Sequence, residues 1–120
     1  MAKILIVDDE AQVRFTLAEV LGEAGHQVIA ASGGAEALRL ADDELDAVIS
    51  DLAMPGMDGL SVARAVQQEN IFCPIVILTM YIDSELRRQA ALAGVCAYIH
   101  KENAVAEVIP ALRALAGGQA

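Results

Sequence analysis

Five short apolar runs, rich in β-branched side chains, alternate with longer amphipathic segments along this chain of 120 residues. The runs cover residues 4–7, 28–31, 47–50, 75–78 and 97–99. Because their hydrophobicity is continuous rather than alternating, they predict strands that are buried on both faces, as the strands of a parallel sheet are.

The segments between the runs have the residue spacing of helices. An apolar stripe within residues 12–24 is formed by Val13, Leu17, Val20, Leu21 and Ala24. Further helices are expected over residues 34–42, 59–69, 84–93 and 104–116. Gly25 and Gly94 are suited to end the first and the fourth of these helices.

The regular alternation of strand and helix predicts an α/β fold. We expect a doubly wound, flavodoxin-like sheet of five parallel strands in the order 2-1-3-4-5, with five helices on its two faces. The length fits a single domain over residues 1–120, in which residues 117–120 form a tail or the start of a linker.

Pro110 lies inside the last expected helix. The apolar stripe of this helix is formed by Val105, Val108, Ile109 and Leu112. The helix should therefore begin before the proline, with Asn103 or Ala104 as its cap, and bend where the Ala106 carbonyl loses its partner. The alternative is a turn over residues 104–108 and a helix that starts at Pro110.

Charge, hydropathy and cysteine usage disfavour several classes of partner and several cellular locations. The net charge of −9 disfavours direct binding to nucleic acid or an anionic membrane. The apolar stretch over residues 71–82 is shorter than the ~20 residues of a membrane helix, and the first apolar run is too short for a signal peptide. We therefore expect a cytoplasmic protein whose Cys73 and Cys96, outside any CxxC motif, are buried and reduced.

Reactive polar residues follow four of the five expected strands. They are Asp8, Asp9 and Glu10 after the first strand, Asp51 after the third, Thr79 after the fourth, and His100 and Lys101 after the fifth. Asp favours turns in any loop, so one such residue alone would indicate little. Four neighbouring strands that agree predict a site at the carboxyl edge, near the switch between the first and third strands. The opposite strand ends (Lys3, Gln27, Asp46, Pro74 and Val95) show no convergent chemistry.

Three carboxylates at one edge repel each other, and one would take up a proton unless a cation lay among them. Mg2+ suits such oxygen ligands and keeps several waters. It would also neutralise the oxygens of a transferring phosphoryl group. An aspartate can attack phosphorus to give an acyl phosphate, which Lys101 and the Thr79 hydroxyl could then contact.

The ordered set of motifs resembles the response-regulator receiver domain of two-component signal transduction, in the CheY-like superfamily. The motifs are Val7-Asp8-Asp9-Glu10, Asp51-Leu52-Ala53-Met54-Pro55-Gly56-Met57-Asp58-Gly59, Leu78-Thr79 and Tyr98-Ile99-His100-Lys101. The resemblance covers the chain from Lys3 to about Ala116. The Thr-Met-Tyr run and the Lys-Glu pair are similar to receivers that precede a helix-turn-helix output domain.

The resemblance implies a metal site and a phosphoacceptor. Asp51 would take the phosphoryl group from a phosphohistidine of a sensor histidine kinase or a phosphotransfer protein. Asp9 and Asp51 would bind Mg2+ directly, Asp8 would do so through water, and the Ala53 carbonyl would be a further ligand. The chain would then be a signalling domain, rather than an enzyme on other substrates, that catalyses its own phosphorylation and slow dephosphorylation.

The resemblance also implies a switch. Thr79 would contact the phosphoryl group, Lys101 would pair with it, and Tyr98 would turn inward. For Tyr98, chemistry alone leaves simple packing as an equal alternative. The output surface would be the fourth helix, fifth strand and fifth helix, which would control an output domain, a partner or a homodimer.

Three other functions are alternatives. A hydrolase of the haloacid dehalogenase type also forms an aspartyl phosphate, but it needs a D-x-D motif after the first strand, where Asp8 and Asp9 are adjacent. A flavodoxin-like electron carrier needs a hydroxyl-rich phosphate loop at that place. A receiver that serves only as a docking surface would keep the fold without phosphorylation.

Overall fold

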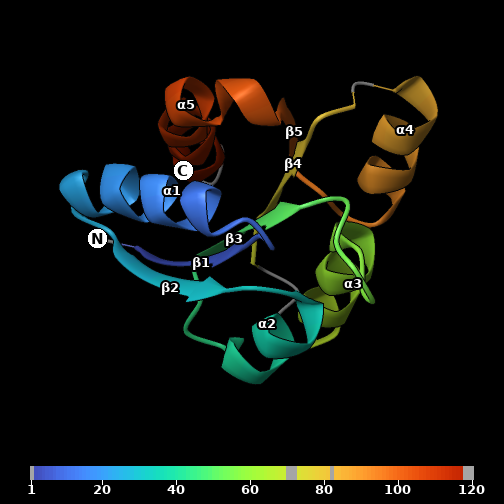
Figure 1. The fold of residues 1–120 in the computed structure, drawn as a ribbon, viewed down its shortest axis with the longest axis horizontal. Coiled ribbons are helices and arrows are strands. Elements are labelled where there is room, and N and C mark those ends of the chain that lie inside the picture. Colours follow the sequence, from blue (N-terminus) through green and yellow to red (C-terminus); the bar gives the residue numbers. More distant parts are fainter. Residues whose placement is uncertain (1, 70–72, 82, 118–120) are drawn as a thin grey trace.

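The computed structural model describes residues 2–69, 73–81 and 83–117 (Figure 1). Its strands are β1 (Lys3–Val7), β2 (Gln27–Ala31), β3 (Ala47–Asp51), β4 (Ile75–Thr79) and β5 (Ala97–His100). Its helices are α1 (Ala11–Glu23), α2 (Gly34–Leu40), α3 (Gly59–Glu69), α4 (Ser84–Leu92) and α5 (Ala104–Gly117), with a 3-10 turn at Lys101–Asn103. None of the described helices is long and apolar enough to cross a membrane.

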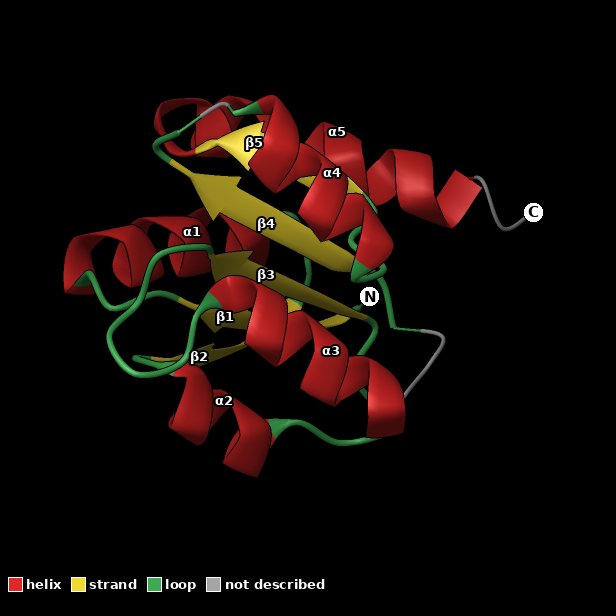
Figure 2. Ribbon diagram, turned by 90° about the vertical axis from the view of Figure 1, so that its right-hand side faces the viewer, coloured by secondary structure: helices red, strands yellow, loops and turns green. Residues whose placement is uncertain are grey.

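The five strands form one parallel sheet in the order β2-β1-β3-β4-β5, which confirms the predicted order. β3 and β4 are buried along their whole length, whereas the edge strand β2 is partly exposed. Figure 2 shows the strands running in the same direction, so their carboxyl ends meet at one edge. In the register, Val7 lies opposite Ser50 and Thr79 opposite His100, which brings the residues that follow each strand together.

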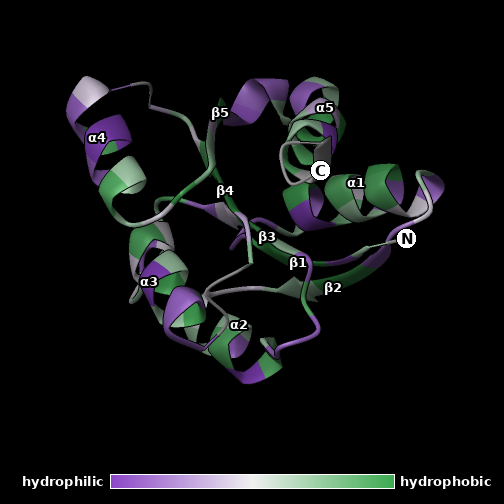
Figure 3. Ribbon diagram, turned by 180° about the vertical axis from the view of Figure 1, so that it is seen from behind, coloured by the Kyte–Doolittle hydropathy of each residue, from purple (hydrophilic) through white to green (hydrophobic). Residues whose placement is uncertain are grey.

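Helices cover both faces of the sheet (Figure 1). Alternate side chains of a strand are buried on opposite faces. α1 and α5 cover one face, where Ile4 and Ile6 of β1 pack in the same cluster as Leu17 and Val108. α2, α3 and α4 cover the other face, where they pack on Leu5 and Val7 of β1 and on other buried residues of the strands. The covering helices carry both hydrophilic and hydrophobic residues (Figure 3), as a helix with one buried side must.

Glycines end two helices as the sequence predicts, and an aspartate caps a third. Gly25 (φ 92°) follows α1 and Gly94 (φ 88°) follows α4, in the left-handed conformation that glycine adopts without strain. Asp58 caps α3, because its Oδ1 accepts a hydrogen bond of 2.8 Å from the Ser61 N–H. Ala24, which was expected on the buried stripe of α1, is instead exposed just beyond the end of that helix.

α5 begins before Pro110, so the alternative helix that starts at the proline is wrong. The helix begins at Ala104 and continues directly from the 3-10 turn. Its buried stripe was predicted with one error, since Val105 is 52% exposed while Ala104 and Val108 are buried. Residues four apart share a helix face, and the preceding 3-10 turn places Ala104 rather than Val105 against the sheet. The bend at Pro110 stays a prediction.

The two cysteines differ in environment. Both are free thiols, but only Cys73 is buried, while Cys96 is exposed, so the expectation of two buried thiols is wrong for Cys96. Burial raises the pKa of the Cys73 thiol to about 11. Cys96 lies in the turn between Gly94 and β5. β5 is the edge strand on the side opposite β2 and is partly exposed.

Candidate functional site

Two buried aspartates lie side by side at the carboxyl edge of the sheet. Asp8 follows β1 and is fully buried, and Asp51 ends the neighbouring strand β3 with 5% exposure. Gly59, at the start of α3, packs against the Asp51 backbone so closely that a Cβ there would lie 2.3 Å from the Asp51 carbonyl oxygen. Glycine therefore allows α3 to approach the acidic edge of the sheet.

Lys101 joins the carboxylates. Its Nζ lies 3.0 Å from Asp8 Oδ2, 3.3 Å from Asp51 Oδ2 and 2.5 Å from Glu10 Oε1. The side chain of Lys101 is only 8% exposed, so its charge is held among the acids rather than in water. The structure thus brings the fifth strand's lysine to the acids of the first and third strands, as the sequence predicts.

The closeness of these charges shifts their titration. Burial, and then the charge of Asp8, raises the pKa of Asp51 to about 6, although Lys101 partly opposes the shift. Burial also raises the pKa of Asp8, against hydrogen bonds from the Glu10 N–H and Lys101. Burial lowers the pKa of Lys101, but its bonds to Glu10 and Asp8 outweigh burial and raise that pKa overall.

The acidic cluster has the donor set of a hard cation. Carboxylate oxygens of Asp8, Asp9 and Glu10 lie within 4.8 Å of one another, and Asp9 and Glu10 are exposed. Asp8 Oδ2 is buried without a hydrogen bond among the described residues and lies 3.0 Å from Lys101 Nζ. A buried carboxylate oxygen with spare acceptor capacity, next to exposed carboxylates, fits Mg2+. Ala53 is exposed in the loop between β3 and α3, two residues after Asp51.

Thr79 and Tyr98 are linked through the backbone of Tyr81. The Tyr81 N–H donates to Thr79 Oγ1 at 3.0 Å, and the Thr79 hydroxyl donates to the Tyr81 carbonyl at 3.3 Å. The Tyr98 hydroxyl donates to the same carbonyl at 3.1 Å. Arg87 of α4 lies over the Tyr98 ring, 5.4 Å from its centroid. Thr79 is thus buried beside β3, while Tyr98 contacts the β4–α4 loop rather than the carboxylates.

Comparison with known proteins decides the family. A family model described as the response regulator receiver domain matches residues 4–113. The chain belongs to this family. The fold is thus that of the receiver domain of two-component response regulators.

Individual curated proteins and solved structures belong to the same family. The receiver is 38% identical over 112 residues to the transcriptional regulatory protein PdtaR of Mycobacterium tuberculosis, covering 92% of this chain and 54% of PdtaR. The chain spans about half the length of the curated relatives it matches. Chemotaxis protein CheY4 of Vibrio cholerae superposes with a TM-score of 0.90 at 31% identity, over 96% of this chain and 98% of CheY4.

A third relative was solved with ligands. Response regulator TrrA of Thermotoga maritima, in complex with Mg2+ and BeF, has a TM-score of 0.83 and 33% identity to the receiver. The match covers 96% of this chain and 99% of TrrA. The likeness therefore extends over nearly the whole of both chains.

One residue beside Asp8, Arg14, was missed from sequence, whereas Glu10 was placed at the site without a role. Arg14, on the first turn of α1, donates from Nη1 to the Asp8 carbonyl at 2.8 Å. Glu10 donates its backbone N–H to Asp8 Oδ1 at 2.8 Å and pairs with Lys101 through its side chain. The signal available was spacing, since Arg14 lies one helical turn after Glu10 at the start of the helix that follows the acids.

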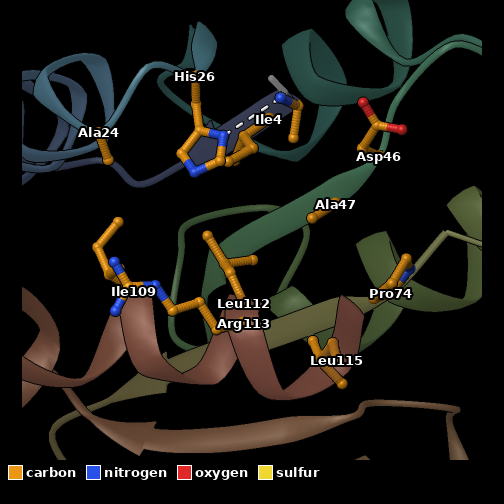
Figure 4. A pocket seen from close by; sticks show the side chains of 11 residues that line it. Ile4, Ala24, His26, Asp46, Ala47, Pro74, Ile109, Leu112, Arg113 and Leu115 are labelled. Carbon is orange, nitrogen blue, oxygen red and sulfur yellow. Dashed lines mark hydrogen bonds between the residues drawn. The ribbon is translucent and has the colours of Figure 1, made fainter. Parts of the chain in front are cut away.

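The opposite edge of the sheet carries a pocket that the residue pattern did not predict. Figure 4 shows a pocket of about 490 Å³ near the amino ends of β1 and β3, with Ile4 and Ala47 on one side and Leu112 of α5 on the other. His26 and Asp46 contribute polar groups to it. The receiver's acidic cluster follows the opposite, carboxyl ends of the same strands, so the two features are separate.

Proposed function

We propose that this receiver accepts a phosphoryl group on Asp51 from the phosphohistidine of a sensor histidine kinase or a phosphotransfer protein. Asp51 Oδ would form a bond to phosphorus while the phosphorus–nitrogen bond of the donor breaks and its imidazole leaves. The observation that carries the proposal is the buried Asp51 carboxylate between a second buried acid, Asp8, and the Lys101 ammonium.

Mg2+ would be held by Asp8, Asp9, Asp51 and the Ala53 carbonyl, and it would neutralise oxygens of the transferring group. The exposed position of Asp9 and the spare acceptor capacity of Asp8 support this assignment. The TrrA complex with Mg2+ and BeF supports it by likeness. Thr79 and Lys101 would donate to the phosphoryl oxygens once the metal has taken over the carboxylates.

The proposed switch is the hydrogen-bonded group of Thr79, Tyr81 and Tyr98. If the Thr79 hydroxyl turns toward a phosphoryl oxygen, its hydrogen bond to the Tyr81 carbonyl is lost. The Tyr81 backbone would then be free to move, and Tyr98, which donates to the same carbonyl, would be free to move with it. The change would reach α4, β5 and α5, which would act on an output domain, a partner or a second copy of the chain. With a net charge of −9, this domain would not itself grip nucleic acid.

The test uses Mg2+ with acetyl phosphate or beryllofluoride. Wild-type protein should bind Mg2+ and then show a mass increase with acetyl phosphate, whereas Asp51→Asn should not be phosphorylated. Asp9→Asn and Asp51→Asn should both weaken Mg2+ binding in a titration, with Glu102→Gln as a control of equal charge change on an exposed residue. Unchanged Mg2+ affinity in both aspartate variants would refute the metal assignment, and no phosphorylation of the wild type would favour the docking-only receiver.

A further inference from the structure

The ammonium of Lys101 lies nearest to an acid for which the proposed chemistry has no use. Its distance to Glu10 Oε1 is 2.5 Å, compared with 3.0 Å to Asp8 Oδ2 and 3.3 Å to Asp51 Oδ2. Among the three acids, Asp8 and Asp51 are buried, while the Glu10 side chain is 61% exposed. The nearest partner of Lys101 is therefore the exposed acid rather than the proposed acceptor.

The contact with Lys101 is not a by-product of helix capping. Glu10 is the residue before α1, and its side chain makes no capping hydrogen bond to that helix. Its backbone N–H donates to Asp8 Oδ1 at 2.8 Å, which fixes the start of its side chain beside the acids. The carboxylate of Glu10 is thus directed at Lys101 by the turn that also places Asp8.

Lys101 makes two hydrogen bonds in this arrangement, to Glu10 Oε1 and Asp8 Oδ1, and its charge also lies beside Asp8 Oδ2 and Asp51 Oδ2. An ammonium has three N–H donors and no acceptor. Four carboxylate oxygens surround it, since Asp8 Oδ1 lies at 3.3 Å in addition to the three contacts above. A phosphoryl group on Asp51 adds negative charge and needs a donor from the same ammonium. Under the proposed function Mg2+ takes over the Asp8 and Asp51 carboxylates, so Glu10 is the partner that stays on Lys101 and competes with the phosphoryl group for it.

We propose that Glu10 is a positioning residue that holds Lys101 back from the phosphoryl group and so lowers the affinity of the site for that group. This rests on the proposed function. A neutral isostere at position 10 would release one donor of Lys101 and would remove a negative charge that faces the phosphoryl oxygens. Both effects favour the occupied state.

The experiment measures beryllofluoride binding, by 19F NMR or calorimetry, at saturating Mg2+ so that differences in metal affinity drop out. Glu10→Gln should bind beryllofluoride about threefold to tenfold more tightly than wild type, as expected for removal of one ion pair. Glu102→Gln, an equal charge change on an exposed residue next to Lys101 in sequence, should bind as wild type does. Since the Glu10 side chain is mostly exposed, the variant should fold.

A gain in affinity separates positioning from a structural role, because structural damage would only weaken binding. Equal or weaker binding in Glu10→Gln would overturn the role of Glu10, as would the same gain in Glu102→Gln, which would indicate a general effect of charge. Wild-type protein that binds no beryllofluoride at all would instead contradict the proposed function itself.

Discussion

At the scale of single residues, the Mg2+-free site is a cluster of acids that the fold holds together at a cost. Because burial and Asp8 raise the pKa of Asp51 to about 6, the folded protein takes up this proton at a higher pH than the unfolded chain. The folded state is therefore stabilised by that proton at low pH, and the stability is lost as pH rises from the unfolded pKa through about 6. The full cost is present at neutral pH.

Asp51→Asn should accordingly stabilise the protein when Mg2+ is chelated. We expect the free energy of unfolding at about pH 7 to rise by roughly 1–3 kcal/mol, since each pKa unit is worth about 1.4 kcal/mol. Near pH 4 the gain should largely vanish. Urea unfolding at both pH values measures this, with the exposed Asp43→Asn as control. An equal gain at both pH values would contradict the electrostatic explanation.

Ala53 and Tyr81 are also residues whose effect can be tested singly. Both are exposed: Ala53 lies two residues after the proposed acceptor, and Tyr81 lies two residues after Thr79, to which it is hydrogen-bonded. The Ala53 side chain cannot orient a water, and Tyr81, 66% exposed, can obstruct one. The phosphorylated form should therefore be comparatively long-lived.

Ala53→Asn combined with Tyr81→Glu should shorten the lifetime of the phosphoryl group, because an amide and a carboxylate can hold the attacking water. Loss of phosphoprotein after removal of the donor measures the rate. Val105→Asn, which places the same amide on the exposed side of α5, should leave it unchanged. A double variant with the wild-type rate would show that these positions do not control hydrolysis.

At the scale of elements, the close approach of α3 to β3 depends on one glycine. Gly59→Ala should lower the free energy of unfolding by roughly 2 kcal/mol or more, because its Cβ would clash with the Asp51 backbone, which cannot move like a side chain. Gly22, inside α1, has nothing within 4 Å of an added Cβ. Gly22→Ala should therefore raise stability by about 0.5–1 kcal/mol.

Thermal or urea unfolding of the two variants gives a matched comparison of one methyl group at two helices. If Gly59→Ala were as stable as the wild type, α3 would have room to shift away from Asp51. The same variant should also bind Mg2+ more weakly under the proposed function, since it disturbs the backbone that carries the acceptor.

At the scale of the whole molecule, strands and their order were predictable because burial on both faces leaves a strong pattern in short runs such as residues 75–78. The convergence of Asp8, Asp51 and Lys101 followed from strand order alone. Side-chain exposure at the ends of elements did not follow. The exposure of Val105 depends on the 3-10 turn before α5, and that of Cys96 on a turn at the edge of the sheet. Contacts such as that of Arg14 depend on rotamers that spacing does not determine.

The two cysteines provide a probe of the whole fold. In native protein, only the exposed Cys96 should react quickly with a thiol reagent, because Cys73 is buried and its raised pKa disfavours the reactive thiolate. Labelling followed by mass measurement should give one modified thiol, and a second only as the molecule unfolds. Cys96→Ser should leave no rapid reaction, and rapid labelling of that variant would show that Cys73 is accessible through local opening.

The strand order also has a consequence for how the chain assembles. β1 lies between β2 and β3, and Ile4 pairs with both Val28 and Ala47. A chain that emerges from the ribosome amino end first therefore displays one apolar strand edge of β1 until β3 has followed. Pairing β1 with β3 closes a long loop, and the entropy of that closure is lost before the contacts of the pair form. This order of events slows folding. β1, which leads into Asp8, is thus made before both of its neighbours and gains the second of them only once the chain has been synthesised to Asp51, about two fifths of its 120 residues.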